Sequence, residues 1–252
     1  MGGGLCGINS FAAYYGLGGK KDFEGFDLLI LEPKGYTDDQ IKALKSAGKV
    51  LSAYLSIVEM HPDDSLFGIL AEDDFVKSGG TPIMNTEYGT YYMDITKFRI
   101  RELLLIRAED YAKAGFDGFF LDTAGNIELL NIEEEYRQRL ISSAAELMRE
   151  IKSRFPDKSI IQNNALLKLC DLTAGLVDGI CFENPPLKTA GNLIWTLSAF
   201  KKLASVAKEK GITVFVLQEE TADLTCLKSF AIKKLSKMKG FLYYRAPKHY
   251  GA

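Results

Sequence analysis

Histidine is scarce in this sequence, with only His61 and His249 among 252 residues. The four cysteines are scattered, without the paired close spacing of a zinc site: Cys6, Cys170, Cys181 and Cys226. The shortage of histidine argues against a histidine-rich metal site, so we expect neither a metal nor another cofactor. We interpret the cysteines as free thiols, which favours a reducing compartment.

A basic charge excess and a long apolar run are also missing. The formal net charge is −2, whereas a nucleic-acid-binding domain commonly has a basic patch and a pI above about 9. No apolar run approaches the roughly 18 residues needed to span a bilayer. Residues 1–4 show no positive n-region or apolar core of a signal peptide. We therefore expect no nucleic-acid partner and no membrane span, and the sequence leaves the oligomeric state open.

What the chain does contain is a regular alternation of short apolar segments and helical patterns. Eight segments have the composition of buried strands: 8–15, 26–31, 49–57, 119–121, 159–163, 179–182, 213–217 and 240–244. Nearly all are followed by a helical pattern, which indicates βαβ units and a parallel sheet. Eight units in about 250 residues predict one (β/α)8 TIM barrel over residues 1–252, with a long loop after strand three. An open doubly wound sheet is the rival, but no glycine-rich phosphate loop follows the first segment.

That loop, residues 61–92, is rich in Gly, Asp and Tyr and has no sustained period. Loops of this length inside a compact domain are commonly lids or binding loops. We expect it to lie over the functional face of the barrel; the alternative is a surface loop without a role in the site.

The segment 114–123 combines a helix end, a turn, a short apolar strand and an acid. Gly115 can take the left-handed conformation that ends a helix, and 119–121 is too apolar for a solvated strand. Asp122 follows where backbone pairing stops, a position that faces the open mouth of a parallel barrel. From this segment alone, a helix N-cap role for Asp122 is equally good.

The same pattern recurs at 177–184, where Asp178-Gly179 precedes an apolar strand that ends at Glu183. Two acids that end two strongly apolar strands would be costly if buried without a purpose, because a buried charge must be paired or neutralised. The repetition therefore favours Asp122 and Glu183 as catalytic residues that face each other across the mouth, within roughly 10 Å.

Other predicted strands also end in polar and aromatic side chains. Aromatic rings stack on sugar faces while amides and acids bind hydroxyl groups, so this composition suits a hydroxyl-rich, uncharged or mildly cationic ligand. We expect ten residues to bind a carbohydrate substrate: Tyr14, Tyr54, Ser56, Glu59, Asp94, Gln162, Asn163, Glu219, Tyr244 and Arg245.

Two facing carboxylates suit cleavage of a glycosidic bond, in which one acid protonates the leaving oxygen and the other works ionised. We expect Asp122 to be the nucleophile, since Thr123 and a helix start follow it and amide donors favour the ionised form. We expect Glu183 to be the acid/base, because its apolar setting raises the pKa. The carboxyl separation, and so the choice between retention and inversion, is not encoded in the pattern.

Four segments, in this order, resemble the polygalactosaminidase-related barrels of glycoside hydrolase family 114: 54–59 (YLSIVE), 116–123 (FDGFFLDT), 161–163 (IQN) and 179–183 (GICFE). The resemblance covers nearly the whole chain. It implies that Asp122 and Glu183 are the catalytic pair and that the substrate is an α-1,4-linked galactosamine-containing polysaccharide. Similar proteins are often exported; residues 1–4 show no signal peptide, and a removed leader is the alternative, so localisation stays open.

The sequence departs from that family's pattern near the mouth. Val58 replaces the usual glycine, tyrosines replace a tryptophan-rich stretch before Asp94, and Gln218-Glu219 replaces an aspartate. Two other functions therefore stay open. A carbohydrate-binding barrel without activity would keep the tyrosines and amides but hold its acids apart or in salt bridges. A metal-dependent hydrolase or deacetylase would need more histidine than the chain has.

Overall fold

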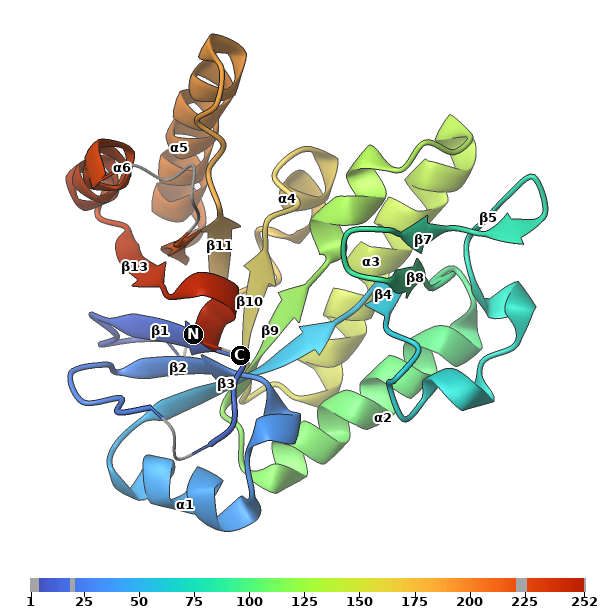
Figure 1. The fold of residues 1–252 in the computed structure, drawn as a ribbon, viewed down its shortest axis with the longest axis horizontal. Helices are drawn as coiled ribbons and strands as arrows, with labels where there is room; N and C mark the ends of the chain where they lie inside the picture. The colour runs from blue at the N-terminus through green and yellow to red at the C-terminus, as the bar shows by residue number, and fades with distance from the viewer. Residues whose placement is uncertain (1–4, 19–20, 221–225, 252) are drawn as a thin grey trace.

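The computed structural model describes residues 5–18, 21–220 and 226–251. Eight parallel strands form one sheet, in which each strand pairs with its predecessor in the series. They are β1 (Phe11–Tyr14), β2 (Leu28–Leu31), β3 (Val50–Ser56), β9 (Gly118–Asp122), β10 (Ser159–Asn163), β11 (Gly179–Glu183), β12 (Thr213–Glu219) and β13 (Leu242–Ala246). The connecting helices are α1 (Asp38–Ser46), α2 (Phe98–Ala114), α3 (Glu134–Arg154), α4 (Lys168–Thr173), α5 (Ala190–Lys210) and α6 (Cys226–Lys239). The predicted TIM-barrel fold is confirmed (Figure 1).

The barrel differs from a regular one at the seam between β1 and β13. Within the described residues these two strands share no hydrogen-bonded ladder, and the connection between β1 and β2 contains no helix. Side chains close the seam instead. The ring of Phe11 on β1 meets that of Tyr244 on β13, with the centroids 5.8 Å apart. A turn over residues 248–251 follows β13 and lies beside β1 (Figure 1).

The predicted loop after strand three has more structure than its sequence indicated. It contains a small antiparallel sheet of β4 (Glu59–Met60), β8 (Thr90–Tyr92) and β7 (Met84–Asn85), and a hairpin of β5 (Lys77–Ser78) and β6 (Thr81–Pro82). Within the same segment, the rings of Phe67, Phe75 and Tyr91 pack against one another. Alternation over two or three residues is too short to show as a period, which is why the pattern was missed. Among the helices that the structure describes, none is long and apolar enough to cross a membrane.

Helix ends follow their local sequence. Thr37 begins α1 with a capping box, accepting from the Gln40 amide while the Gln40 side chain accepts from the Thr37 amide. Gly115 ends α2 in the left-handed conformation at φ 109°, as predicted from its position.

In the repeated Asp-Gly pattern, the aspartate just before each strand has a structural role. Asp117 accepts from the Leu51 amide and pairs with Lys45 at 2.6 Å. Asp178 likewise accepts from the Ile160 amide and pairs with Lys152 at 2.9 Å. Each aspartate therefore fastens the start of its strand to the preceding strand and to an outer helix, whereas the second acid of the pattern lies at the opposite end of the strand.

The glycines of this pattern fit a crowded barrel interior. A Cβ added at Gly118 would lie 2.1 Å from Ser159 Oγ and 2.5 Å from the Ser159 carbonyl oxygen. We expect Gly118→Ala to lower the free energy of unfolding by about 1–3 kcal/mol, because overpacking forces the backbone to shift. Gly175→Ala is the matched control, since its Cβ would enter open space. Chemical denaturation of both variants checks the prediction, and equal losses would contradict it.

Candidate active site

Asp122, Asn163 and Glu183 meet at the C-terminal ends of three adjacent strands, β9, β10 and β11. Asn163 Nδ2 donates to Asp122 Oδ1 at 2.6 Å and also to Glu183 Oε2. Two hydrogen bonds from one nitrogen place the accepting oxygens no more than about 6 Å apart. Asn163 itself is only 2% exposed, whereas both carboxylates are half-buried. The structure thus brings the two predicted acids together on one amide.

Each of these three residues is followed by a residue with left-handed backbone. Thr123, Asn164 and Asn184 have φ values of 66°, 51° and 48°, a conformation that asparagine tolerates better than most residues. Both asparagines also cap the neighbouring strand. Asn164 Oδ1 accepts from the Glu183 amide at 3.0 Å, and Asn184 Oδ1 accepts from the Glu219 amide at 2.8 Å. The sharp turns therefore end the strands and fix the site residues at the mouth.

The electrostatics of the pair are set by proximity and burial. Burial and the Asp122 carboxylate raise the pKa of Glu183 to about 7, against the opposing effect of hydrogen bonds from Tyr250 and Asn163. No ion pair formed within 5–18, 21–220 and 226–251 includes either acid; Arg245, for example, pairs with Glu220 at 2.7 Å. Within the described residues, the acids are thus neither far apart nor held in salt bridges, the two arrangements expected of a carbohydrate-binding barrel without activity.

A row of three tyrosines lies beside the acids. Tyr15 lies between the other two, with its ring centroid 4.9 Å from that of Tyr54 and 4.8 Å from that of Tyr250. Burial and the nearby carboxylates raise the pKa of each phenol, so all three hydroxyls stay protonated. Tyr54 was predicted here; Tyr15 and Tyr250 were not.

Two predicted substrate-binding tyrosines lie away from the mouth. Tyr14 faces the outer side of β1, where its ring packs edge-on against Phe23. Since side chains alternate along a strand, it is the next residue, Tyr15, that faces the site. Tyr244 is deep in the seam, where its ring meets Phe11 and its hydroxyl accepts from Lys21 Nζ at 2.8 Å. Neither position supports contact with a ligand at the mouth.

Gln162 and Arg245 also lie outside the site, for the same reason of alternation. Gln162 is fully buried; its amide nitrogen donates to the carbonyl oxygens of Asn164 and Ala165, and its oxygen accepts from Thr173. It supports the turn after β10. Arg245 lies on the outer side of β13 with Glu220.

Three further predicted residues anchor the long segment after β3. The buried Glu59 carboxylate accepts from Asn126 Nδ2 at 2.6 Å and from Thr90 Oγ1 at 2.5 Å. Ser56 Oγ donates to the Glu59 carbonyl oxygen at 2.7 Å. Asp94 Oδ1, at the other end of the segment, accepts from Thr96 Oγ1 at 2.6 Å. The bond from Asn126 ties the segment to the connection after β9, the Ser56 and Asp94 bonds fix its two ends locally, and Glu59 is left with little capacity to bind a ligand.

Tyr88 and Glu219 complete the rim. Tyr88 is 64% exposed, and burial of its hydroxyl together with the charges of Glu87 and Glu183 raises its pKa to about 12. Of the segment's Tyr88, Tyr91 and Tyr92, it is Tyr88 on which the charges of Glu183 and Glu219 act. Glu219 ends β12 and accepts from the His249 amide at 2.7 Å. Its charge also acts on Glu183 and Tyr88, so the mouth carries three acidic groups.

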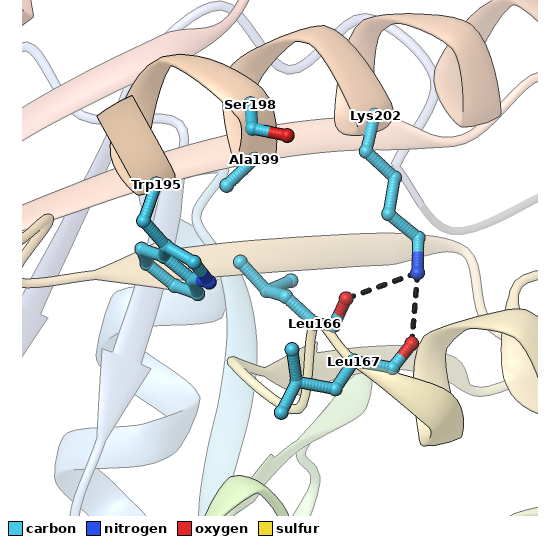
Figure 2. A pocket seen from close by; sticks show the side chains of 6 residues that line it. All are labelled: Leu166, Leu167, Trp195, Ser198, Ala199 and Lys202. Atoms are coloured by element: carbon cyan, nitrogen blue, oxygen red, sulfur yellow. Dashed lines mark hydrogen bonds between the residues drawn. The ribbon is translucent and has the colours of Figure 1, made fainter. Parts of the chain in front are cut away.

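A separate cavity of about 310 Å³ lies between α5 and the segment after β10 (Figure 2). Its lining includes Trp195, Leu166 and Leu167, and Lys202 Nζ donates to the carbonyl oxygens of both leucines. None of the acids at the mouth lines this cavity. Among the described residues, no group of three or more His, Cys, Asp or Glu side chains is placed to hold a metal ion.

Comparison with solved structures supports the same fold. The glycoside hydrolase domain of PelA from Pseudomonas aeruginosa superimposes with a TM-score of 0.77 at 17% identity, over 97% of this chain and 96% of that one. Ega3 of Aspergillus fumigatus, in complex with galactosamine, gives a TM-score of 0.70 at 13% identity, over 96% and 91%. The α-galactosidase TtGalA from Thermus thermophilus gives a TM-score of 0.63 at 13% identity, over 97% of this chain and 59% of that one.

No protein of known, curated function matches the sequence significantly. The model of glycoside-hydrolase family GH114 matches residues 10–184, from just before β1 to just after Glu183. That match covers more than half of the chain and includes Asp122, Asn163 and Glu183. The chain therefore belongs to glycoside-hydrolase family GH114, and it is a glycoside hydrolase with the TIM-barrel fold.

Proposed function

We propose that this glycoside hydrolase cleaves its polysaccharide with retention of anomeric configuration, with Asp122 as nucleophile and Glu183 as general acid/base. The observation that carries the proposal is the single Asn163 nitrogen shared by both carboxylates. Oxygens within about 6 Å of each other suit retention, for which carboxyl groups lie about 5–5.5 Å apart, and leave no room for the water that inversion requires.

In the first step, an ionised Asp122 oxygen forms a bond to the anomeric carbon while the glycosidic C–O bond breaks. Glu183 gives its proton to the departing oxygen. A pKa of about 7 keeps much of the Glu183 population protonated near neutral pH, which is what a general acid needs. Asn163 donates to Asp122 Oδ1, which holds that oxygen at the mouth beside Glu183.

In the second step, ionised Glu183 takes a proton from water, whose oxygen bonds to the anomeric carbon as the ester bond to Asp122 breaks. The geometry supplies a reason for this change of role. The Asp122 charge is one of the two main causes of the raised Glu183 pKa, and that charge disappears once Asp122 is esterified. The pKa of Glu183 then falls, so the same group becomes a base.

The substrate class we propose is an α-1,4-linked polymer containing galactosamine. Glu219, Glu183 and Asp122 make the mouth acidic, and Glu219 has no Lys or Arg in an ion pair within the described residues, only His249 at 3.9 Å. An acidic mouth attracts a protonated amino sugar. The structural likeness to Ega3 in complex with galactosamine is consistent with this class.

The coupling between the acids can be measured without a substrate. We expect Asp122→Asn to lower the pKa of Glu183 below 7, because the substitution removes a negative charge that disfavours a second one. Carbon-13 NMR titration of the glutamate carboxyl groups, with Glu183→Gln to assign the signal, reports the shift. Asp171→Asn, at an exposed position paired with Lys202, is the control. An unchanged Glu183 pKa in Asp122→Asn would show that the charges do not interact.

The roles separate with an aryl α-galactosaminide whose leaving group needs no proton. We expect Asp122→Ala and Glu183→Ala each to lower hydrolysis of the polymer by several orders of magnitude. On the aryl substrate with azide, Glu183→Ala should give the α-azide with retained configuration, because its nucleophile is intact. Asp122→Ala should give only the inverted β-azide.

Reversed azide products would exchange the two roles. Full activity of both alanine variants would refute the mechanism, whereas loss of activity in Asp171→Ala as well would indicate a general folding defect.

Glu219 provides a test of the substrate class. We expect wild-type kcat/KM to be higher on α-1,4-galactosamine polymer than on its N-acetylated form, because acetylation removes the ammonium charge. Glu219→Gln should reduce that preference by about fivefold to tenfold, since a partly exposed charge pair contributes about 1 kcal/mol. Glu220→Gln is the matched control, as Glu220 pairs with Arg245. Mass spectrometry of the products measures both rates, and a preference for the acetylated polymer would exclude this class.

A further inference from the structure

Tyr250 reaches the site from the last described turn of the chain. Its hydroxyl donates to Glu183 Oε1, while Asn163 donates to the other oxygen, Oε2. Glu183 is thus held on both oxygens, from two elements on different sides of the mouth. Tyr250 lies outside residues 10–184, the part that matches the family model.

The direction of the Tyr250 hydrogen bond is fixed by Asn184. Asn184 Oδ1 accepts from the Glu219 amide at 2.8 Å, which sets the orientation of the side-chain amide. Its nitrogen therefore points to Tyr250 and donates to the phenol oxygen at 3.1 Å. A hydroxyl that accepts from Asn184 has its own proton free to donate, and it donates that proton to Glu183.

A backbone hydrogen bond and a ring contact hold Tyr250 in place. Its carbonyl oxygen accepts from the Tyr15 amide at 3.2 Å, and its ring lies against the Tyr15 ring. The neighbouring glycine is fitted to the outer side of β1, because a Cβ at Gly251 would come within 2.3 Å of the Tyr14 ring. Gly16 is equally close, since its Cβ would lie 2.6 Å from the Gly251 carbonyl oxygen. Glycine at positions 16 and 251 therefore leaves the space that the turn occupies.

We propose that Tyr250 is a positioning residue for this reaction: it holds the Glu183 carboxyl in its working orientation and sets the pH range over which Glu183 exchanges its proton. This inference rests on the proposed role of Glu183. The turn over residues 248–251, which follows β13, thereby has a function in the site.

The groups around Glu183 determine the direction of the expected change. Titratable or charged side chains face it from several elements: Tyr15 after β1, Tyr54 on β3, Tyr88 in the segment after β3, Asp122 on β9, Glu219 on β12 and Tyr250. All of the carboxylates disfavour ionisation of Glu183, and the Tyr250 and Asn163 bonds favour it. Removing the Tyr250 hydroxyl must therefore raise the Glu183 pKa.

The test compares wild type with Tyr250→Phe, which keeps the ring and removes only the hydroxyl. Carbon-13 NMR titration should show a higher Glu183 pKa in the variant, by about one unit. The alkaline limb of kcat/KM on α-1,4-galactosamine polymer should move upward by the same amount, and kcat should fall about tenfold, with KM little changed. A role confined to packing would be rescued by phenylalanine and would leave the pKa in place.

Tyr111→Phe is the matched control, because Tyr111 lies on α2 and its ring meets Phe116 rather than the mouth. It should leave the Glu183 titration unchanged. If Tyr250→Phe does not fold, Asn184→Gly removes the amide that orients the phenol, at a φ of 48° that suits glycine, and should shift the pKa in the same direction. An unshifted Glu183 titration in the folded variant overturns the inference. Loss of activity in Glu183→Ala is a separate result, on which the proposed function depends.

Discussion

The site depends on one amide nitrogen shared by two carboxylates. Asn163 Nδ2 holds Asp122 and Glu183 at a distance where two negative charges strongly disfavour each other. Burial and the Asp122 charge together raise the pKa of Glu183 to about 7. In the proposed mechanism, this raised pKa is what suits Glu183 to act as a general acid. The buried position of Asn163 makes the arrangement part of the fold rather than of a mobile loop.

Holding that amide in place requires strands that end abruptly and in register. The left-handed residues Thr123, Asn164 and Asn184 turn the chain away directly after the site residues. At the opposite end, Asp117 and Asp178 fasten the strand starts. The repeated sequence pattern therefore contains two kinds of acid: one that contacts a lysine and a neighbouring amide, and one at the mouth that forms no ion pair within the part of the chain that the structure describes. The two kinds of acid are told apart by the end of the strand at which each lies. In a parallel barrel, the common direction of the strands fixes which end is the mouth.

This division explains what could be predicted from the sequence. Strand ends marked by an acid after an apolar run located Asp122 and Glu183, because burial makes such acids costly without a function. The side of a strand on which a side chain lies was harder to predict. Tyr14 was predicted at the mouth, but Tyr15 faces it. Gln162 and Asn163 were both predicted there, and only Asn163 faces it, since a shift of one residue reverses the side of a strand. Tyr250 gave no signal, because its place depends on how the chain packs after its last strand. Glu59 was placed near the site, but its bonding to Asn126 and Thr90 was not visible in any periodicity.

The seam between β1 and β13 connects the architecture to the chemistry. Where described residues form no ladder between the two strands, aromatic side chains and the turn over 248–251 fill the gap. The Tyr15 amide, which has no strand partner after the end of β1, donates to the Tyr250 carbonyl oxygen of this turn. The same contact carries the phenol to Glu183. A backbone group that must find a hydrogen-bond partner thus determines where the tyrosine lies, so closure of the barrel and orientation of the acid depend on the same few residues.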